Sequence, residues 1–102
     1  MEVITRHAAA RAVSRLGFEP TEARRKLKWL HGVSTETRPR HLPAWFRPAR
    51  KTYSDHAMFW ATNYAGLETV LVVVPTPEDR VLVTVITERN REPGAPSLAT
   101  EY

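Results

Sequence analysis

A histidine and two arginines share one edge of an Ala-rich segment near the start of the chain, ITRHAAARAVSRLG from Ile4 to Gly17. Residues four apart are neighbours on a helix, so His7, Arg11 and Arg15 would form one ridge. An apolar ridge predicted to face the core lies beside it: Ala9, Val13 and Leu16. A neutral imidazole can accept a proton, and the arginine fork matches phosphate oxygens. The ridge therefore indicates acid–base chemistry on a phosphate diester, with an ordinary solvated helix face as the alternative.

RNA cleavage can proceed without a metal ion. A base removes the 2′-hydroxyl proton, an acid protonates the leaving oxygen, and fixed cations stabilise the phosphate charge. His7 would lie in the first helical turn, where the helix dipole disfavours the imidazolium and leaves a neutral base. His56, in the stretch YSDH, is a second candidate acid or base, or else only a turn residue.

Other kinds of site have little support in the sequence. None of the four histidines forms a pair with the short spacing of a zinc site, and cysteine is absent. A glycine-rich phosphate loop and a glycine-flanked serine nucleophile are also absent. We therefore expect neither a metal nor a cofactor.

Positive charge is concentrated in the first half of the chain. Residues 1–51 hold 12 of the 15 Lys and Arg and 4 of the 11 acidic residues, a net charge of +8, whereas residues 52–102 have −4. Such asymmetry indicates a polyanionic partner such as RNA, or an acidic protein that covers the surface; a role in solubility alone is the plainest alternative. The residues predicted to bind RNA are Arg15, Arg24, Arg25, Lys28, Arg47, Arg50 and Lys51.

Length and hydropathy indicate one globular domain. The chain has 102 residues, of which 42% are hydrophobic, enough for one modest core. The start of the sequence lacks the apolar run of a signal peptide, and the longest apolar block, VLVVV, is too short to cross a bilayer. We expect a soluble, cytoplasmic protein with no membrane association.

Two helices and then several strands are expected along the chain. Thr5 and Gly17 would cap the first helix, and the second would begin at Pro20 and stop at Gly32. The strand segments are MFWATNYAG, LETVLVVVP and RVLVTVITE, with PTPED as the turn of a hairpin. Val3 and Ile4 are either a short strand or a lead-in, and Trp45 and Phe46 are candidates for a short edge strand, with at least one of the two in the core.

These elements predict an α+β fold in which two N-terminal helices pack on one face of a three- to four-stranded antiparallel β-sheet. Residues 1–88 would form this single domain. Residues 89–102 have loop composition and are expected to be a flexible C-terminal tail.

The opening ITRHAAARAVSR, the basic second helix and the closing hairpin VLVVVPTPEDRVLVTVIT together resemble the small ribonuclease toxins of the barnase, colicin and RelE superfamily. The resemblance is to compact members with a helix of the pattern His-Ala-x-x-Arg and a last strand carrying a threonine before apolar residues. It covers residues 3 to 88. It implies that His7 is the helix histidine, Arg11 the arginine one turn on, and Thr84 the strand hydroxyl.

Two threonines of the last strand compete for that place. Strict alternation puts Thr84 on one face with Leu82 and Ile86, and Thr87 on the other face with Val83 and Val85. The resemblance favours Thr84, whereas ordinary cross-strand packing would explain either residue.

The prediction is a metal-independent endoribonuclease, the toxin of a toxin–antitoxin pair, with RNA as substrate and an acidic antitoxin as partner. The alternative is a non-catalytic nucleic-acid- or protein-binding module, of the kind that a phage or mobile element encodes, because basic residues bind phosphates without any chemistry.

Overall fold

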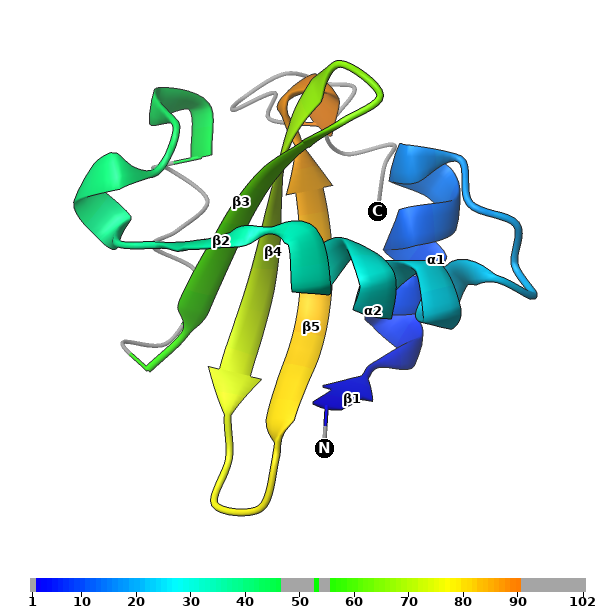
Figure 1. Cartoon of the computed structure of the whole chain (residues 1–102), viewed down its shortest axis with the longest axis horizontal. Coiled ribbons are helices and arrows are strands. Elements are labelled where there is room, and N and C mark those ends of the chain that lie inside the picture. The colour runs from blue at the N-terminus through cyan, green and yellow to red at the C-terminus, as the bar shows by residue number, and fades with distance from the viewer. Residues whose placement is uncertain (1, 47–52, 54–55, 91–102) are drawn as a thin grey trace.

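The computed structural model describes residues 2–46, 53 and 56–90. Within these residues the chain forms two α-helices, five β-strands and three short 3-10 helices (Figure 1). In chain order the elements are β1 (Glu2–Ile4), α1 (Arg6–Leu16), α2 (Ala23–Val33), β2 (Thr35–Thr37), η1 (Pro39–His41), η2 (Ala44–Phe46), β3 (Met58–Tyr64), β4 (Leu67–Pro75), β5 (Arg80–Thr87) and η3 (Glu88–Asn90). No helix in this part of the chain is long and apolar enough to span a bilayer.

The strands form one sheet in the order β1-β5-β4-β3-β2. The α+β class and the two N-terminal helices are confirmed. The predicted sheet was wrong in two respects, since the described residues contain five strands and β1 runs parallel to β5, which makes the sheet mixed. The two edge strands, β1 and β2, have three residues each; for Val3 and Ile4 of β1 the structure selects the short strand over the lead-in, whereas β2 was not predicted. Strands so short are below the length at which alternation becomes a signal.

Local capping fixes both ends of α1. The Thr5 hydroxyl accepts a hydrogen bond from the Ala8 amide at 3.0 Å, and Gly17 takes the left-handed conformation with φ 74°. The Gly17 amide donates a hydrogen bond to the Val13 carbonyl at 3.2 Å. These are the predicted caps, and they fix where the ridge of α1 begins and ends.

The face of α1 that packs on the sheet differs from the predicted one. Its buried residues are Ala8, Ala12 and Arg15. The expected core ridge is only partly buried: Ala9, Val13 and Leu16. Alanine at two of the three contact positions has little bulk, which lets the helix approach the sheet closely.

Helix α2 buries the predicted apolar stripe of Ala23, Leu27 and Leu30. Its predicted ends were both shifted. The helix begins at Ala23 after a turn that contains Pro20, and it continues through Gly32 to Val33. The Ser34 hydroxyl donates to the Leu30 carbonyl at 2.6 Å, so this contact, and not the glycine, accompanies the end of the helix.

The sheet is covered on both faces. Figure 1 shows α1 and α2 together, with α2 crossing in front of the strands, and the side chains of both pack on residues such as Leu71, Leu82 and Val85. On the opposite face, Phe46 and Leu42 pack on β3, β4 and β5. Trp45 and Phe46 form a 3-10 helix and not an edge strand, and Phe46 is fully buried, as expected for at least one of the pair.

A β-bulge between β4 and β5 breaks the alternation assumed for the last strand. Thr84 lies opposite Val72, but the next paired residue of β5 is Leu82, so Val83 has no partner across the strand pair. The extra residue rotates the two halves of β5 relative to each other. Leu82 therefore belongs to the helix-side core and Ile86 to the core on the opposite face.

This register corrects the predicted faces of both threonines. Thr84 lies with its partner Val72 and with Ile86, on the face away from the helices, because paired residues of adjacent strands share a face. Thr87 lies on the helix side with Val85, as predicted, but Val83 does not accompany it.

The connections between the long strands are tight. PTPED forms the predicted turn of the β4–β5 hairpin, closed by a hydrogen bond from the Thr76 amide to the Asp79 carbonyl at 2.7 Å. Ala65 and Gly66 join β3 to β4, both with positive φ. At the end of the chain, residues 89 and 90 of the predicted tail belong to η3, and residues 91–102 lie outside the described residues.

Candidate functional site

The ridge of α1 begins at His7, three residues after strand β1 ends at the edge of β5. The Thr5 amide donates to the Leu82 carbonyl at 3.1 Å, and the Thr5 hydroxyl donates to the Val83 carbonyl at 3.3 Å. Thr5 thus ties the start of α1 to the bulged part of β5. His7 is exposed on the first turn of the helix, and Arg11 is half-buried one turn further on.

The electrostatic surroundings of His7 favour the neutral ring. Partial burial lowers the pKa of His7 below its usual 6.5, and the positive charges of Arg11 and Arg15 lower it further. At pH 7 the imidazole is therefore largely unprotonated and able to accept a proton. The sequence indicated the same protonation state from the helix dipole, whereas the structure gives burial and two arginines as the causes.

Arg15 points toward the sheet and not toward solvent. Its side chain is 7% exposed, and its Nη1 donates to the Val85 carbonyl at 2.9 Å. Strand β1 pairs only with Arg80, Val81 and Leu82, so β1 covers only the start of that edge of β5. Arg15 supplies a donor further along the strand, and its observed contact is structural.

The basic residues predicted on α2 are all exposed. Arg24 Nε donates to the Ile4 carbonyl at 3.4 Å, and Arg25 forms an ion pair with Glu22. Lys28 is exposed on the same helix. The three remaining residues predicted to bind RNA, Arg47, Arg50 and Lys51, lie outside the described residues.

The structure does not bring Thr84 or His56 to the ridge. Thr84 is buried on the sheet face opposite α1. One row of paired residues crosses the sheet through Ile4, Leu82, Val73 and Met58. Three strand spacings separate its ends, roughly 14 Å. His7 follows one end of this row and the exposed His56 precedes the other, so the two histidines belong to different sides of the domain.

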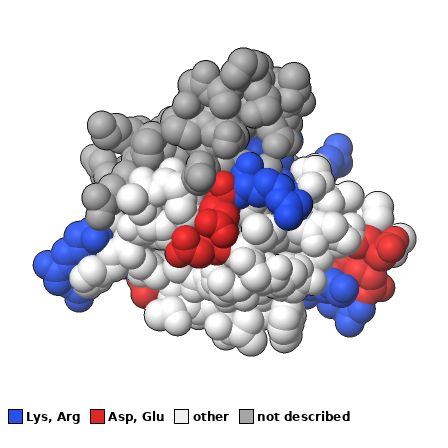
Figure 2. All heavy atoms as spheres, turned by 90° about the horizontal axis from the view of Figure 1, so that it is seen from above, with Lys and Arg blue, Asp and Glu red and all other residues white. Residues whose placement is uncertain are grey.

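Charges of both signs share the described surface. Seen from above, groups of Lys and Arg lie among groups of Asp and Glu, separated by uncharged residues (Figure 2). The Lys and Arg residues that the structure describes therefore do not form one continuous basic patch on this face. Any contacts with phosphates on this face would have to come from small local groups of Lys and Arg.

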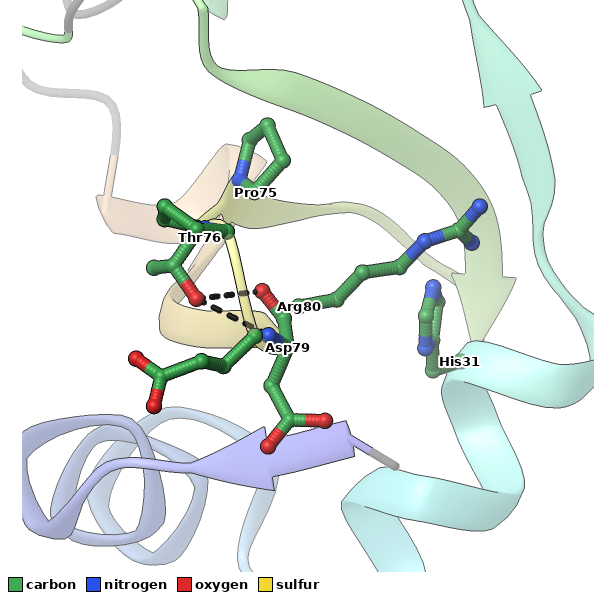
Figure 3. Close-up of a pocket in the computed structure, with 7 residues that line it drawn as sticks. His31, Pro75, Thr76, Asp79 and Arg80 are labelled. Carbon is green, nitrogen blue, oxygen red and sulfur yellow. Dashed lines mark hydrogen bonds between the residues drawn. The ribbon is translucent and has the colours of Figure 1, made fainter.

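A polar hollow of about 560 Å³ lies between the end of α2 and the β4–β5 turn (Figure 3). The His31 ring meets the Trp60 ring edge to face at 4.6 Å, and the Arg80 guanidinium lies 5.9 Å from the same indole. Figure 3 shows His31 beside the end of the Arg80 side chain, with the turn on the other side. The Thr76 hydroxyl adds two hydrogen bonds within that turn: it donates to the Asp79 carbonyl at 2.7 Å and accepts from the Asp79 amide at 2.9 Å.

Sequence reasoning missed this second histidine–arginine pair. His31 lies in the last turn of α2, and Arg80 begins β5, 49 positions later. No spacing rule connects such residues, because their approach depends on α2 crossing the sheet above Trp60. The acidic residues of the PTPED turn lie at the same hollow, so its charge is mixed.

A metal centre has no candidate in the described part of the chain, where no three His, Asp or Glu side chains gather to hold an ion. No protein-family model, curated protein or solved structure matches the chain.

Proposed function

We propose that this protein is an endoribonuclease that cleaves RNA without a metal ion, with His7 as the base and Arg11 at the phosphate. The observation that carries the proposal is the ridge of α1, where an exposed histidine lies one turn from an arginine. The lowered pKa of His7 supports it, because a neutral imidazole is the form that accepts a proton. This is also the function that the resemblance to small ribonuclease toxins implies.

In the proposed reaction, His7 removes the proton of a 2′-hydroxyl. The 2′ oxygen then bonds to phosphorus as the bond from phosphorus to the 5′ oxygen breaks, leaving a 2′,3′-cyclic phosphate. Arg11 would stabilise the charge that builds on the non-bridging oxygens. The proton held by His7 returns to the leaving 5′ oxygen directly or through water, so the step needs no second histidine.

We further propose an acidic protein, an antitoxin, as the partner that restrains this activity. The support is electrostatic complementarity with the basic side chains exposed on α2, among them Arg24 and Lys28. Such a partner would compete with RNA for the same side chains.

The proposal is tested by incubating the full chain with several RNAs, including ribosome-associated message, in excess chelator. Wild type should cleave, and His7→Ala should cleave about 10² to 10⁴ times more slowly, the usual contribution of a positioned acid or base. His41→Ala is the matched control, because His41 is equally exposed but lies on η1. Equal rates for wild type and a folded His7→Ala variant would remove His7 from the mechanism.

A second candidate function is binding of nucleic acid without cleavage. The observation that favours it is the separation of Thr84 and His56 from His7, which leaves the ridge without the other predicted catalytic groups. In that case replacing Arg24, Arg25 and Lys28 together should flatten the salt dependence of binding. His7→Ala should then leave the affinity for nucleic acid unchanged.

A further inference from the structure

Three aromatic rings form a continuous series from the core to the surface beside the C-terminal end of α1. Phe18 is buried, and its ring meets Tyr64 edge to face at 5.3 Å. Tyr64 in turn meets Trp29 at 6.5 Å, again edge to face. Trp29 is the outermost member and remains 55% exposed. An indole left this far in water contributes little to folding, so packing alone does not account for it.

Cationic side chains border the exposed ring. Trp29 and Tyr64 line a hollow of about 380 Å³ together with Arg25 and Lys26. The Lys26 ammonium lies 5.4 Å from the centre of the Phe18 ring, and the Arg25 side chain is 76% exposed. The ion pair of Arg25 with Glu22 is a surface contact of the kind that contributes at most about 1 kcal/mol. A phosphate can therefore compete for this guanidinium.

This combination matches the chemistry of a single nucleotide. An aromatic face accepts a base by stacking, which is tolerant of sequence, and a neighbouring cation accepts the phosphate. A paired duplex would not fit, since its bases already stack on each other and present only edges. The positive first half of the chain favours an anionic occupant over a neutral one.

We infer that the hollow at Trp29 and Tyr64 binds an unpaired base of single-stranded RNA, with the adjoining phosphate held by Arg25 and Lys26. The inference rests on the proposed function in taking RNA as the ligand. The hollow lies by the C-terminal end of α1, whereas His7 is on its first turn, about 15 Å away along the helix axis. A strand stacked on Trp29 would have to span this distance to reach His7.

The test is the affinity of the full chain for a short single-stranded RNA methylated at every 2′ oxygen, which blocks cleavage. Binding is followed by the fluorescence anisotropy of a dye attached to the RNA, a signal that does not depend on the mutated indole. Trp29→Ala should weaken binding about 5- to 150-fold, the loss expected for one stacked base. Trp29→Phe should retain most of the affinity, because the phenyl ring also stacks. The matched control is Val33→Ala, which removes another exposed apolar side chain one turn along α2, 56% exposed in the native protein.

The possible results separate the two ideas. Cleavage of unmodified RNA by wild type, together with unchanged binding by Trp29→Ala, would overturn the base site and leave the proposed function standing. Equal losses in Trp29→Ala and Val33→Ala would also overturn it, since the loss of RNA affinity would then not depend on an aromatic ring that can stack on a base. A loss confined to Trp29→Ala, without any cleavage by wild type, would support the base site and reject the nuclease.

Discussion

Replacing Arg15 tests whether this residue stabilises the fold or binds RNA. Arg15→Met keeps much of the length and volume of the stem but removes the guanidinium that donates to the Val85 carbonyl at 2.9 Å. A hydrogen bond from a charged group contributes about 1.5–3 kcal/mol, and an unsatisfied buried acceptor costs a similar amount. We expect the free energy of unfolding to fall by about 2–3 kcal/mol. For a domain of about this size that corresponds to a melting temperature lower by roughly 10–20 °C.

Urea unfolding of the full chain, followed by tryptophan fluorescence and circular dichroism, gives the free energy of unfolding directly. Lys28→Met is the control, because Lys28 is exposed on α2 and its loss should change stability by no more than about 0.5 kcal/mol. RNA binding should be measured at a temperature where both variants are folded. A folded Arg15→Met variant of native stability that no longer binds RNA would refute the structural role and restore the predicted phosphate contact.

The remaining predictions concern the β3–β4 turn and the titration of His7. Ala65 has φ 52° in a turn that favours residues without a Cβ, so Ala65→Gly should raise the free energy of unfolding by about 0.5–1 kcal/mol. Gly66 has φ 83°, so Gly66→Ala should lower the free energy of unfolding. A lower free energy of unfolding in both variants would contradict the assigned turn. The pKa of His7 is lower in the folded state than its usual 6.5, so the unfolded chain binds the proton more tightly and stability should fall as the pH drops below about 6.5. His7→Gln should lose less stability than wild type between pH 7.5 and 5.5 in urea unfolding, and identical pH profiles would exclude this linkage.

The parts of the fold that depend on neighbouring residues in the chain were predictable. Thr5 and Gly17 cap α1 as expected because capping involves a side chain and amides within one turn. The bulge at Val83 was not predictable, since it follows from the pairing of β5 with β4 and leaves no mark on the alternation of β5. Strand β2 was not predicted for the same reason, because a strand of three residues is defined by its partner, and Val3 and Ile4 of β1 could only be left open as a short strand or a lead-in.

The site was predictable only as far as helix geometry holds. A spacing of four residues is about 40° more than one full turn of an α-helix, so a row of every fourth residue drifts around the axis. Arg11 is displaced by about 40° from His7 and is half-buried, and Arg15 is displaced by about 80°, close to the sheet-facing Ala8 and Ala12. The spacing correctly predicted that His7 and Arg11 are neighbours on the helix, but it did not predict that Arg15, one turn further, lies against the sheet. Trp29 was overlooked because its exposure depends on the path of α2 across the domain.

Because the ridge turns around the helix axis, its two ends have different surroundings: Arg15 lies against the sheet and His7 is exposed. Arg15, at the inner end, donates to the Val85 carbonyl, and this contact fixes the position of its charge. That charge is one of the causes of the lowered pKa of His7, two turns away and exposed. The arginine that donates to the edge of β5 therefore also biases the histidine toward the neutral form.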